Sequence, residues 1–342
     1  MSATASHPPR VLLLGGAGFL GYHATLQFLQ RGYEVTILAL PPPPEPGLFP
    51  VQAKTVFKDV NTILDRELLA LLTGQEAIVF AAGADDRLLP HRPSWPFFYK
   101  HNVETAAHFF RLARQAGVKR GVLLSSYFAH FARIWPELHL AQHHPYIRSR
   151  VEQEQAVLDA AGDMTRFAAN RDRVPSLSVV ILELPYIFGA MPGRRPLWTP
   201  LLKYINSTPV IFYPRGGTNM IAVDHVAEAI AGAVERGRPG TRYLVGDENL
   251  TWVEFLHRLS RAMGKEKPVV TLPDILLRSG LRLVRMLHHI KGREGGLDPV
   301  HLLKLQTANT FFDPEPSRQA LGYGQGGLDQ AFAATVRAAL GR

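Results

Sequence analysis

Residues 11–21 read VLLLGGAGFLG, a run of apolar residues followed by a run rich in glycine. A continuous apolar run is typical of a strand that is buried on both faces of a parallel sheet. From Gly18 to Gln30 the apolar residues recur at helical spacing, and Gly32 supplies a helix-ending residue. The stretch therefore predicts a strand, a tight turn and a helix in immediate succession.

The same alternation continues through the first half of the chain. Apolar runs that predict strands alternate with segments in which apolar residues have helical spacing. This order predicts an α/β fold, a doubly wound parallel sheet of the Rossmann type. The predicted strands are 33–40, 55–57, 77–80, 118–124 and 178–184, and the predicted helices are 63–72, 97–115 and 146–160.

The pattern changes after residue 185. Loops rich in proline, glycine and arginine surround shorter elements, with helices predicted over 224–235 and 252–263. We expect residues 1–185 to form the Rossmann domain, with residues 221–245 returning to it. Residues 186–342 would form mainly a smaller α/β substrate lobe that closes over the carboxyl ends of the strands.

Composition excludes several classes of protein. The chain of 342 residues has no cysteine, which excludes a disulfide scaffold, a cysteine nucleophile and a thiolate zinc site. No apolar run approaches the length of a spanning helix, and no signal peptide is evident, so we expect a cytoplasmic protein without stable membrane insertion. The net charge of +9 is concentrated between residues 265 and 293, which does not suggest a nucleic-acid partner. We expect a small-molecule substrate instead.

The glycines of the 11–21 stretch lie between a predicted strand and a predicted helix. Glycine at this spacing lets the backbone approach a pyrophosphate at the positively polarised helix N-terminus, which predicts binding of NAD or NADP. The choice between the two stays open, because Ala39 stands where an acidic residue would bind the ribose 2′-hydroxyl. The predicted cofactor contacts in this stretch are Gly15, Gly18, Phe19, Leu20 and Gly21.

A tyrosine and an arginine share one face of the helix predicted over 146–160, since Tyr146 and Arg150 are four residues apart. A nearby cation favours the phenolate and lowers the pKa of a tyrosine. Ser126 follows the strand predicted over 118–124 and would bring a hydroxyl to the other side of a substrate oxygen. These residues predict proton transfer at a hydroxyl or carbonyl group.

Together these features resemble the extended short-chain dehydrogenase/reductases, also called the NAD-dependent epimerase/dehydratase family. The resemblance spans nearly the whole chain and implies hydride exchange between a nicotinamide and a carbinol or ketone. It is carried by the glycine-rich loop, Asn102-Val103, Val118-Lys119-Arg120, Ser125-Ser126, Tyr146 with Val151-Glu152, LPYIFG at 184–189, VDHVA at 223–227, YLVG at 243–246 and LGY at 321–323.

The resemblance implies a role for each matching residue. Tyr146 would be the general acid and base, and Ser126, with Ser125 as the alternative, would position the reacting oxygen. A homodimer that packs through the helices at 97–115 and 146–160 is also implied. The further cofactor contacts would be Asp59 and Val60 at the adenine, Ala81, Ala82 and Gly83 beside the ribose and phosphates, Asn102, Arg150, and Pro185 and Ile187 near the nicotinamide.

Two departures from the family pattern leave the activity open. Arg150 stands where the family has lysine, and arginine does not readily release a proton, so a non-catalytic sensor of nicotinamide nucleotides is one alternative. Residues 216–220 read GGTNM where many sugar-nucleotide epimerases carry an arginine, which resembles the dihydroflavonol reductase and 3β-hydroxysteroid dehydrogenase branch. We expect an NAD(P)-dependent oxidoreductase or epimerase for a nucleoside-diphosphate sugar, with a ketone reductase as the other alternative. The predicted substrate contacts are Ser126, Arg195, Arg215 and Asn219.

Two further patterns admit more than one interpretation. His139 and His143 have the spacing of a metal pair without an evident third ligand, so we expect a polar loop at the substrate mouth and no metal site. Residues 275–290 place Arg278, Arg282 and Arg285 on one helix face beside an apolar strip. Such a helix can lie on an anionic membrane surface or contact a lipophilic substrate, or it can belong to the lobe with a solvated basic face.

Overall fold

The computed structural model describes residues 7–162 and 177–341 and contains a seven-stranded sheet in the order β10-β6-β5-β4-β1-β2-β3. Every neighbouring pair in this sheet is parallel, so the predicted doubly wound sheet is confirmed. Its strands are β1 (Arg10–Leu14), β2 (Glu34–Ala39), β3 (Lys54–Phe57), β4 (Ala77–Phe80), β5 (Arg120–Ser126), β6 (Ser178–Leu184) and β10 (Arg242–Leu244).

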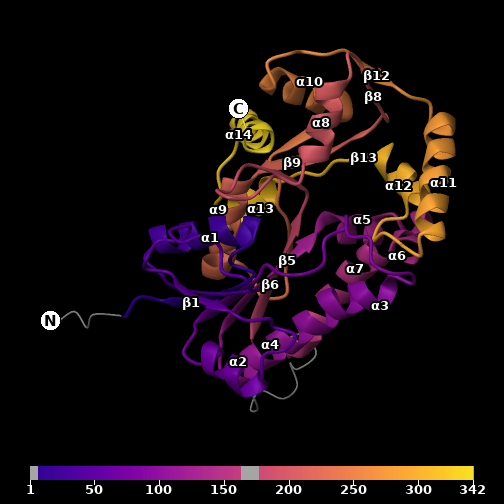
Figure 1. The fold of residues 1–342 in the computed structure, drawn as a ribbon. Coiled ribbons are helices and arrows are strands. Elements are labelled where there is room, and N and C mark those ends of the chain that lie inside the picture. Colours follow the sequence, from indigo (N-terminus) through magenta and orange to yellow (C-terminus); the bar gives the residue numbers. More distant parts are fainter. Residues whose placement is uncertain (1–6, 163–176, 342) are drawn as a thin grey trace.

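Helices cover both faces of the sheet (Figure 1). Alternate residues of β1 enter different cores, since Val11 and Leu13 pack on one face and Leu12 and Leu14 on the other. This alternation explains why the strand is apolar throughout. The helices α1 (Phe19–Gln30) and α9 (Val223–Arg236) cover the first face, and α2 (Asp65–Leu72), α4 (Thr105–Gln115) and α7 (Pro145–Ala161) cover the second.

The helix predicted over 97–115 is three consecutive segments in the structure, α3 (Trp95–Phe98), the π-helical turn η1 (Tyr99–Glu104) and α4. Side chains take over part of the hydrogen bonding of this turn. Gln153 Nε2 donates to the carbonyl oxygen of Asn102 at 2.8 Å, and Thr105 Oγ1 donates to that of Lys100 at 2.9 Å. The segment predicted as a helix is therefore helical throughout, but it contains a π-helical turn that its pattern did not predict. Such turns are frequent at functional sites. The α4 and α7 helices pack against each other, and the homodimer stays a prediction.

A smaller lobe is built from the second half of the chain. Three strands form the path β11-β9-β13, with β7 also paired to β9, and β8 pairs with β12. Aromatic residues from several elements fill the core of this lobe, among them Phe188, Trp252, Phe255 and Phe332. The elements are β7 (Tyr186–Phe188), α8 (Thr199–Ser207), β8 (Ile211–Tyr213), β9 (Gly217–Ala222), β11 (Glu248–Thr251), α10 (Trp252–Ala262), β12 (Val269–Thr271), β13 (Asn309–Thr310) and α14 (Leu328–Leu340).

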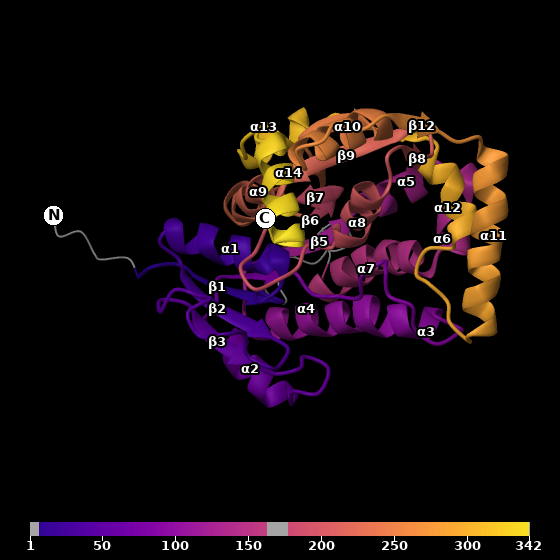
Figure 2. The same cartoon turned by 45° about the horizontal axis from the view of Figure 1, so that its top comes forward.

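The remaining helices lie between and outside these layers. In two views α11 stands at the outer edge of the molecule, with α12 between it and the rest of the chain (Figures 1 and 2). These helices are α5 (Tyr127–Ile134), the 3₁₀ turn η2 (Pro136–Leu138), α6 (Leu140–His143), α11 (Asp274–Ile290), α12 (Pro299–Gln306) and α13 (Glu315–Leu321).

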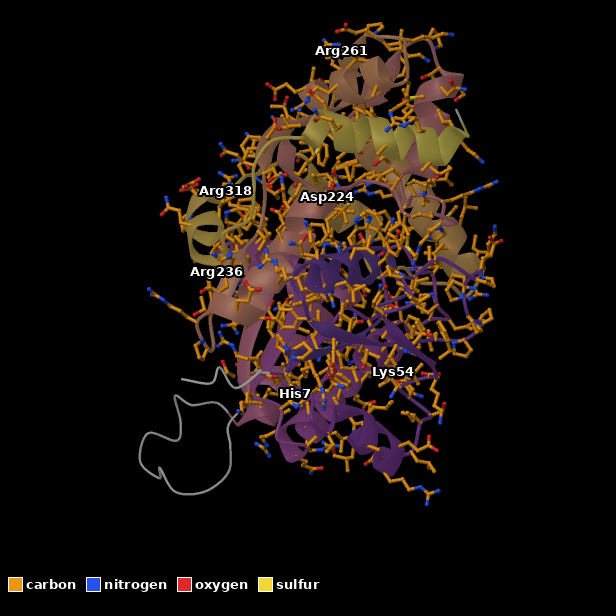
Figure 3. All side chains as sticks on the ribbon, turned by 90° about the vertical axis from the view of Figure 1, so that its left-hand side faces the viewer. His7, Lys54, Asp224, Arg236, Arg261 and Arg318 are labelled. Atoms are coloured by element: carbon orange, nitrogen blue, oxygen red, sulfur yellow. The ribbon has the colours of Figure 1, made fainter. Side chains whose placement is uncertain are left out.

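The α9 and α13 helices pack closely against each other. Figure 3 shows Arg236 of α9 near α13, which carries Arg318, and the Arg236 guanidinium donates to the carbonyl oxygen of Leu321. A Cβ atom on Gly232 would lie 1.9 Å from that same oxygen. Glycine at this position is therefore what allows the close approach of the two helices.

Replacing Gly232 with alanine should lower the free energy of unfolding by about 1–3 kcal/mol, because the methyl group forces α13 away from α9. The matched control is Gly280→Ala in α11, where a Cβ meets no atom within 4 Å. Alanine is the better helix former, so this control should gain about 0.5–1 kcal/mol. Chemical denaturation measures both, and a Gly232→Ala variant as stable as the natural chain would contradict the proposed contact.

Candidate active site

A cavity of about 570 Å³ opens at the carboxyl ends of the sheet strands, where parallel α/β sheets bind ligands. Loops after successive strands line it from the Rossmann side, and one segment of the smaller lobe lines it from the other. The lining comprises residues 18–20 after β1, 81–87 after β4, 124–128 at the end of β5, Tyr146 and Arg150 of α7, residues 184–187 after β6, residues 189–191 and 194–198, and Leu297, Leu302 and Gln306.

The glycine-rich loop forms one end of the cavity. A Cβ on Gly15 would lie 2.6 Å from the carbonyl oxygen of Ala81, and one on Gly21 would lie 2.3 Å from that of Gly15, so no larger residue fits at either place. Gly18, at the N-terminus of α1, lines the cavity, and Arg194 Nη1 lies 3.7 Å from the place of its Cβ. A positively polarised helix end beneath a guanidinium suits an anionic pyrophosphate.

Arg194 is a contact that is not among the residues predicted from the sequence. The structure brings it to the glycine-rich loop from the far side of the cavity. No local pattern signals this, since the approach depends on how the 189–198 segment folds back over the sheet.

Tyr146 lies at the other end of the cavity and is 8% exposed. Its backbone N–H donates to the carbonyl oxygen of Gly296 at 2.9 Å, and its ring meets Phe98 and Phe128 edge-on. Burial raises the pKa of its hydroxyl above the ordinary value, although the charge of Arg150 and the neighbouring Ser126 hydroxyl act to lower it. The structure thus brings together the tyrosine, the arginine and the serine that the sequence singled out.

Arg150 is held by the protein through two of its nitrogens. Nη1 donates to Gln153 Oε1 at 2.7 Å, Nη2 donates to the carbonyl oxygen of Leu124 at 3.3 Å, and its guanidinium carbon lies 5.5 Å from the Tyr146 ring centre. Its buried Nε has no hydrogen-bond partner within residues 7–162 and 177–341. A buried donor without a partner is unfavourable, so a ligand hydroxyl at this place would satisfy it. The ribose of a dinucleotide that spans the cavity supplies such a hydroxyl.

The two serines at the end of β5 have different partners. Ser125 Oγ donates to Glu154 Oε1 at 2.6 Å, which commits this hydroxyl to the protein. Ser126 Oγ accepts from the backbone N–H of Phe128 at 3.3 Å, beside the hydroxyl of Tyr146. Ser126 is therefore the better placed of the two to meet a substrate oxygen.

A network of buried charges lies beneath this site. The carboxylates of Glu154 and Glu183 are each 1% exposed, and Arg133 pairs with both of them. Arg242 Nε also donates to Glu154 Oε2, at 2.7 Å. Burial and the neighbouring charge of Glu154 raise the pKa of Glu183 to about 8, against the lowering effect of Arg133. Sequence reasoning missed this network, since its members come from four separate elements.

Three charged residues after β4 also face the cavity and were missed. Arg87 pairs with Asp85 and Asp86. Burial, with the charge of Asp85, raises the pKa of Asp86 to about 7, whereas hydrogen bonds from Arg87 outweigh burial and lower the pKa of Asp85. Both carboxylates raise the pKa of Tyr146. The available signal was their position, since Asp85-Asp86-Arg87 directly follows the Ala81–Gly83 loop in the chain.

Several residues predicted as cofactor contacts do not line the cavity. The polar side chains among them form hydrogen bonds with the backbone of nearby loops instead. Asn102 is fully buried, and its Oδ1 accepts from the backbone N–H of Ala84 at 2.7 Å, which holds the loop after β4 in place. Asp59 Oδ1 accepts from the backbone N–H of Asn61 at 2.9 Å, and neither Asp59 nor Val60 belongs to the cavity lining. The predicted residues that do line it are Gly18, Phe19, Leu20, Ala81, Ala82, Gly83, Pro185 and Ile187.

Two of the predicted substrate contacts lie away from the cavity. Asn219 is fully buried in β9, where its Nδ2 donates to Asn249 Oδ1 at 2.9 Å. Arg215 is 68% exposed and pairs with Asp274 at 3.3 Å. Arg195 does line the cavity. The loop that carries Arg215 turns outward to α11, so we do not carry Arg215 and Asn219 into the candidate site.

The histidines of the loop before Tyr146 contact the segment at the start of α12. The His143 ring stacks on that of His301 with 3.7 Å between ring centres, and Nδ1 of buried His144 accepts from the backbone N–H of Asp298 at 2.9 Å. Within the described residues no group of three or more acidic or histidine side chains could hold a metal ion. These histidines join α6 to the start of α12.

Comparison with known proteins agrees with this architecture. The sequence profile of the NAD dependent epimerase/dehydratase family matches residues 11–246. A Synechocystis protein assigned as a dihydroflavonol 4-reductase is 24% identical, covering 94% of this chain and 92% of that protein. Human sterol-4-alpha-carboxylate 3-dehydrogenase, decarboxylating, is 23% identical, covering 92% and 83%. Among solved structures, a nucleoside-diphosphate-sugar epimerase from Pseudomonas aeruginosa superposes with a TM-score of 0.68 at 18% identity, covering 97% of each chain, which supports the fold.

Arg194→Gln should weaken binding of the preferred nicotinamide dinucleotide about tenfold, because a charge-assisted hydrogen bond to phosphate is lost. Calorimetric titration with NAD, NADH, NADP and NADPH identifies the preferred form and measures the change. The matched control is Arg195→Gln, whose side chain follows directly in the chain and should change the affinity less than about twofold, since we place Arg195 on the substrate side. Equal affinities for Arg194→Gln and the natural chain would show that Arg194 does not contact the cofactor.

Proposed function

The chain belongs to the NAD dependent epimerase/dehydratase family, and from this we propose that it transfers hydride between NAD or NADP and a secondary alcohol or ketone. The observation that carries the proposal is the position of Tyr146, buried at the cavity between the charge of Arg150 and the hydroxyl of Ser126. This is the arrangement that proton transfer at a reacting oxygen requires.

The residues of the site divide the chemistry among them. The bound nicotinamide supplies a donor or acceptor of hydride. Tyr146 Oη takes the proton of a carbinol, or returns it to a ketone oxygen, and Ser126 Oγ donates a hydrogen bond to that oxygen. Arg150 stabilises the phenolate by its charge. In the family pattern a lysine at this position can pass a proton from the tyrosine to solvent. Arginine does not readily release a proton, so in this chain the proton of Tyr146 would have to reach solvent by another path.

For the substrate we propose a lipophilic ring compound that carries the alcohol or ketone. Apolar and aromatic side chains, including Phe128, Leu297 and Leu302, form the substrate end of the cavity, with carboxyl groups nearby. Gln306 Oε1 is buried without a hydrogen-bond partner among the described residues, so it can accept from a substrate hydroxyl. The relatives named for dihydroflavonol and sterol substrates support the same class.

A nucleoside-diphosphate sugar, the substrate expected from the sequence, is the second candidate. Arg195 lines the cavity and could contact a diphosphate, and several solved structures of similar fold are named for such substrates. Asp85 and Asp86 also line the cavity, but Arg87 pairs with both of them, so the local charge does not decide between the two candidates. The apolar lining at Phe128, Leu297 and Leu302 is the reason to place the lipophilic substrate first.

Tyr146→Phe should lower kcat by at least about a hundredfold, because the group that transfers the proton is lost. A screen of sterol and dihydroflavonol ketones with the preferred reduced cofactor, followed by its absorbance, provides the assay. Tyr204→Phe on α8 is the matched control, since that hydroxyl lies outside the cavity lining, donating to the carbonyl oxygen of Phe212 at 3.0 Å and accepting from its backbone N–H at 2.9 Å. Unchanged turnover by Tyr146→Phe would refute the catalytic assignment, and dinucleotide binding without turnover of any compound in the screen would favour a sensor.

Uridine diphosphate should leave the turnover of a lipophilic ketone unaffected, because under the first substrate proposal the substrate end binds no diphosphate. The measurement is the initial rate of cofactor oxidation at rising concentrations of the nucleotide, with the ketone held below its KM. Competitive inhibition would overturn the substrate assignment in favour of the sugar nucleotide, while leaving the role of Tyr146 intact.

A further inference from the structure

The helix α11 exposes an unusual amount of apolar surface. None of its residues is buried, and Ile275, Leu276 and Ile290 are 75%, 60% and 72% exposed. Single exposed apolar residues are ordinary, but a contiguous set on one element marks a surface that binds something. The remaining members of this apolar stripe of α11 are Leu283, Met286 and Leu287, each about half exposed.

The side chains of α11 sort into three lengthwise stripes, since successive residues turn by about 100° around a helix. The inner stripe, with Leu277, Leu281 and Arg285, is half-buried toward α12. The apolar stripe points away from it. Between them lies a basic stripe of Arg278, Arg282 and His289. The sequence had placed all three arginines on one face, but Arg285 pairs with Asp298 at 3.4 Å and belongs to the inner contact.

The charge around the apolar stripe is strongly positive. Residues 265–293 contain seven lysines and arginines against two acidic residues, a net charge of +5 out of +9 for the whole chain. Lys291 lies at the end of the helix beside Ile290. The apolar stripe is thus bordered by cations, as in helices that lie at a membrane interface.

We propose that α11 binds the surface of an anionic lipid membrane, with its apolar stripe among the acyl chains and its basic stripe at the phosphate headgroups. Charge complementarity selects this occupant. A second copy of α11 would bring a helix with the same excess of cations to this surface, and like charges oppose that contact. Within the described residues no helix is long and apolar enough to cross a membrane, so the attachment is to the surface.

The loop after β4 extends this surface. Leu88 and Leu89 are each 43% exposed, and Arg293 Nη1 donates to the carbonyl oxygen of Leu89 at 3.2 Å. The segment that follows α11 also reaches the active site, because Gly296 accepts from Tyr146 and Leu297 lines the cavity. Only a few residues of the chain therefore separate the proposed membrane-binding helix from the wall of the cavity. The inference goes beyond the proposed reaction and does not depend on it.

Binding of the full chain to lipid vesicles tests the proposal. Phosphatidylcholine vesicles that contain phosphatidylglycerol should bind the natural chain, vesicles of phosphatidylcholine alone should bind it much less, and high salt should weaken the binding. Co-sedimentation gives the partition coefficient in each case.

Two double variants separate the two parts of the surface. Leu283→Glu with Leu287→Glu removes the apolar stripe, Arg278→Glu with Arg282→Glu reverses the basic stripe, and each should lower partitioning onto the mixed vesicles at least about tenfold. The matched control is Leu64→Glu with Arg66→Glu at α2, where both residues are also exposed. This control should bind like the natural chain. Circular dichroism and affinity for the dinucleotide verify that each variant is folded.

Three results would overturn the proposal. The natural chain could fail to bind the mixed vesicles, or the α11 variants could bind as tightly as the control, which would place any binding elsewhere on the basic surface. The third result would come from sedimentation velocity. It is a natural chain that forms a dimer, together with a Leu283→Glu and Leu287→Glu double variant that is a monomer. That result would show that a second copy covers α11.

Discussion

The carboxylate of Glu154 fixes the central helix of the site against the sheet. It accepts hydrogen bonds from Ser125 of β5, Arg133 of α5 and Arg242 of β10. A buried charge is tolerated only when it is fully paired, so each of these elements is constrained by the others. Because Glu154 lies one helical turn after Arg150 and two after Tyr146 on α7, the same bonds set the height of both side chains relative to Ser126.

This constraint also explains how an arginine can stand where the family pattern has a lysine. The fork of Arg150 makes one bond to Gln153 within α7 and one to the end of β5, and both partners are held by the Glu154 network and η1. A lysine has a single nitrogen and could not bridge the helix and the strand in the same way. Arginine therefore stiffens the junction and still leaves its Nε free for a ligand among the described residues.

The elements that the sequence predicted correctly are those whose pattern is local. β4 and β6 match their predicted ranges residue for residue, because buried strands are apolar on both faces. The Tyr146–Arg150 pair follows from helical spacing in the same way. The π-helical turn, the Glu154 network and the position of Arg194 depend on contacts between distant segments, and no spacing rule contains them. Asn219 is a different case. The local motif that suggested a substrate contact is present in the sequence, but the structure buries this side chain in β9, away from the cavity.

The distribution of charge connects the cavity with the outer helix. The two carboxylates after β4 stand at the substrate end, whereas the excess of cations lies outside on α11. Salt limits the reach of exposed charges to about a Debye length, so the cations of α11 act mainly on an anionic surface that adjoins this helix. The two proposals, taken together, point to a lipophilic compound dissolved in a membrane. On that view the apolar stripe of α11 and the apolar cavity wall that follows it in the chain would serve one substrate class.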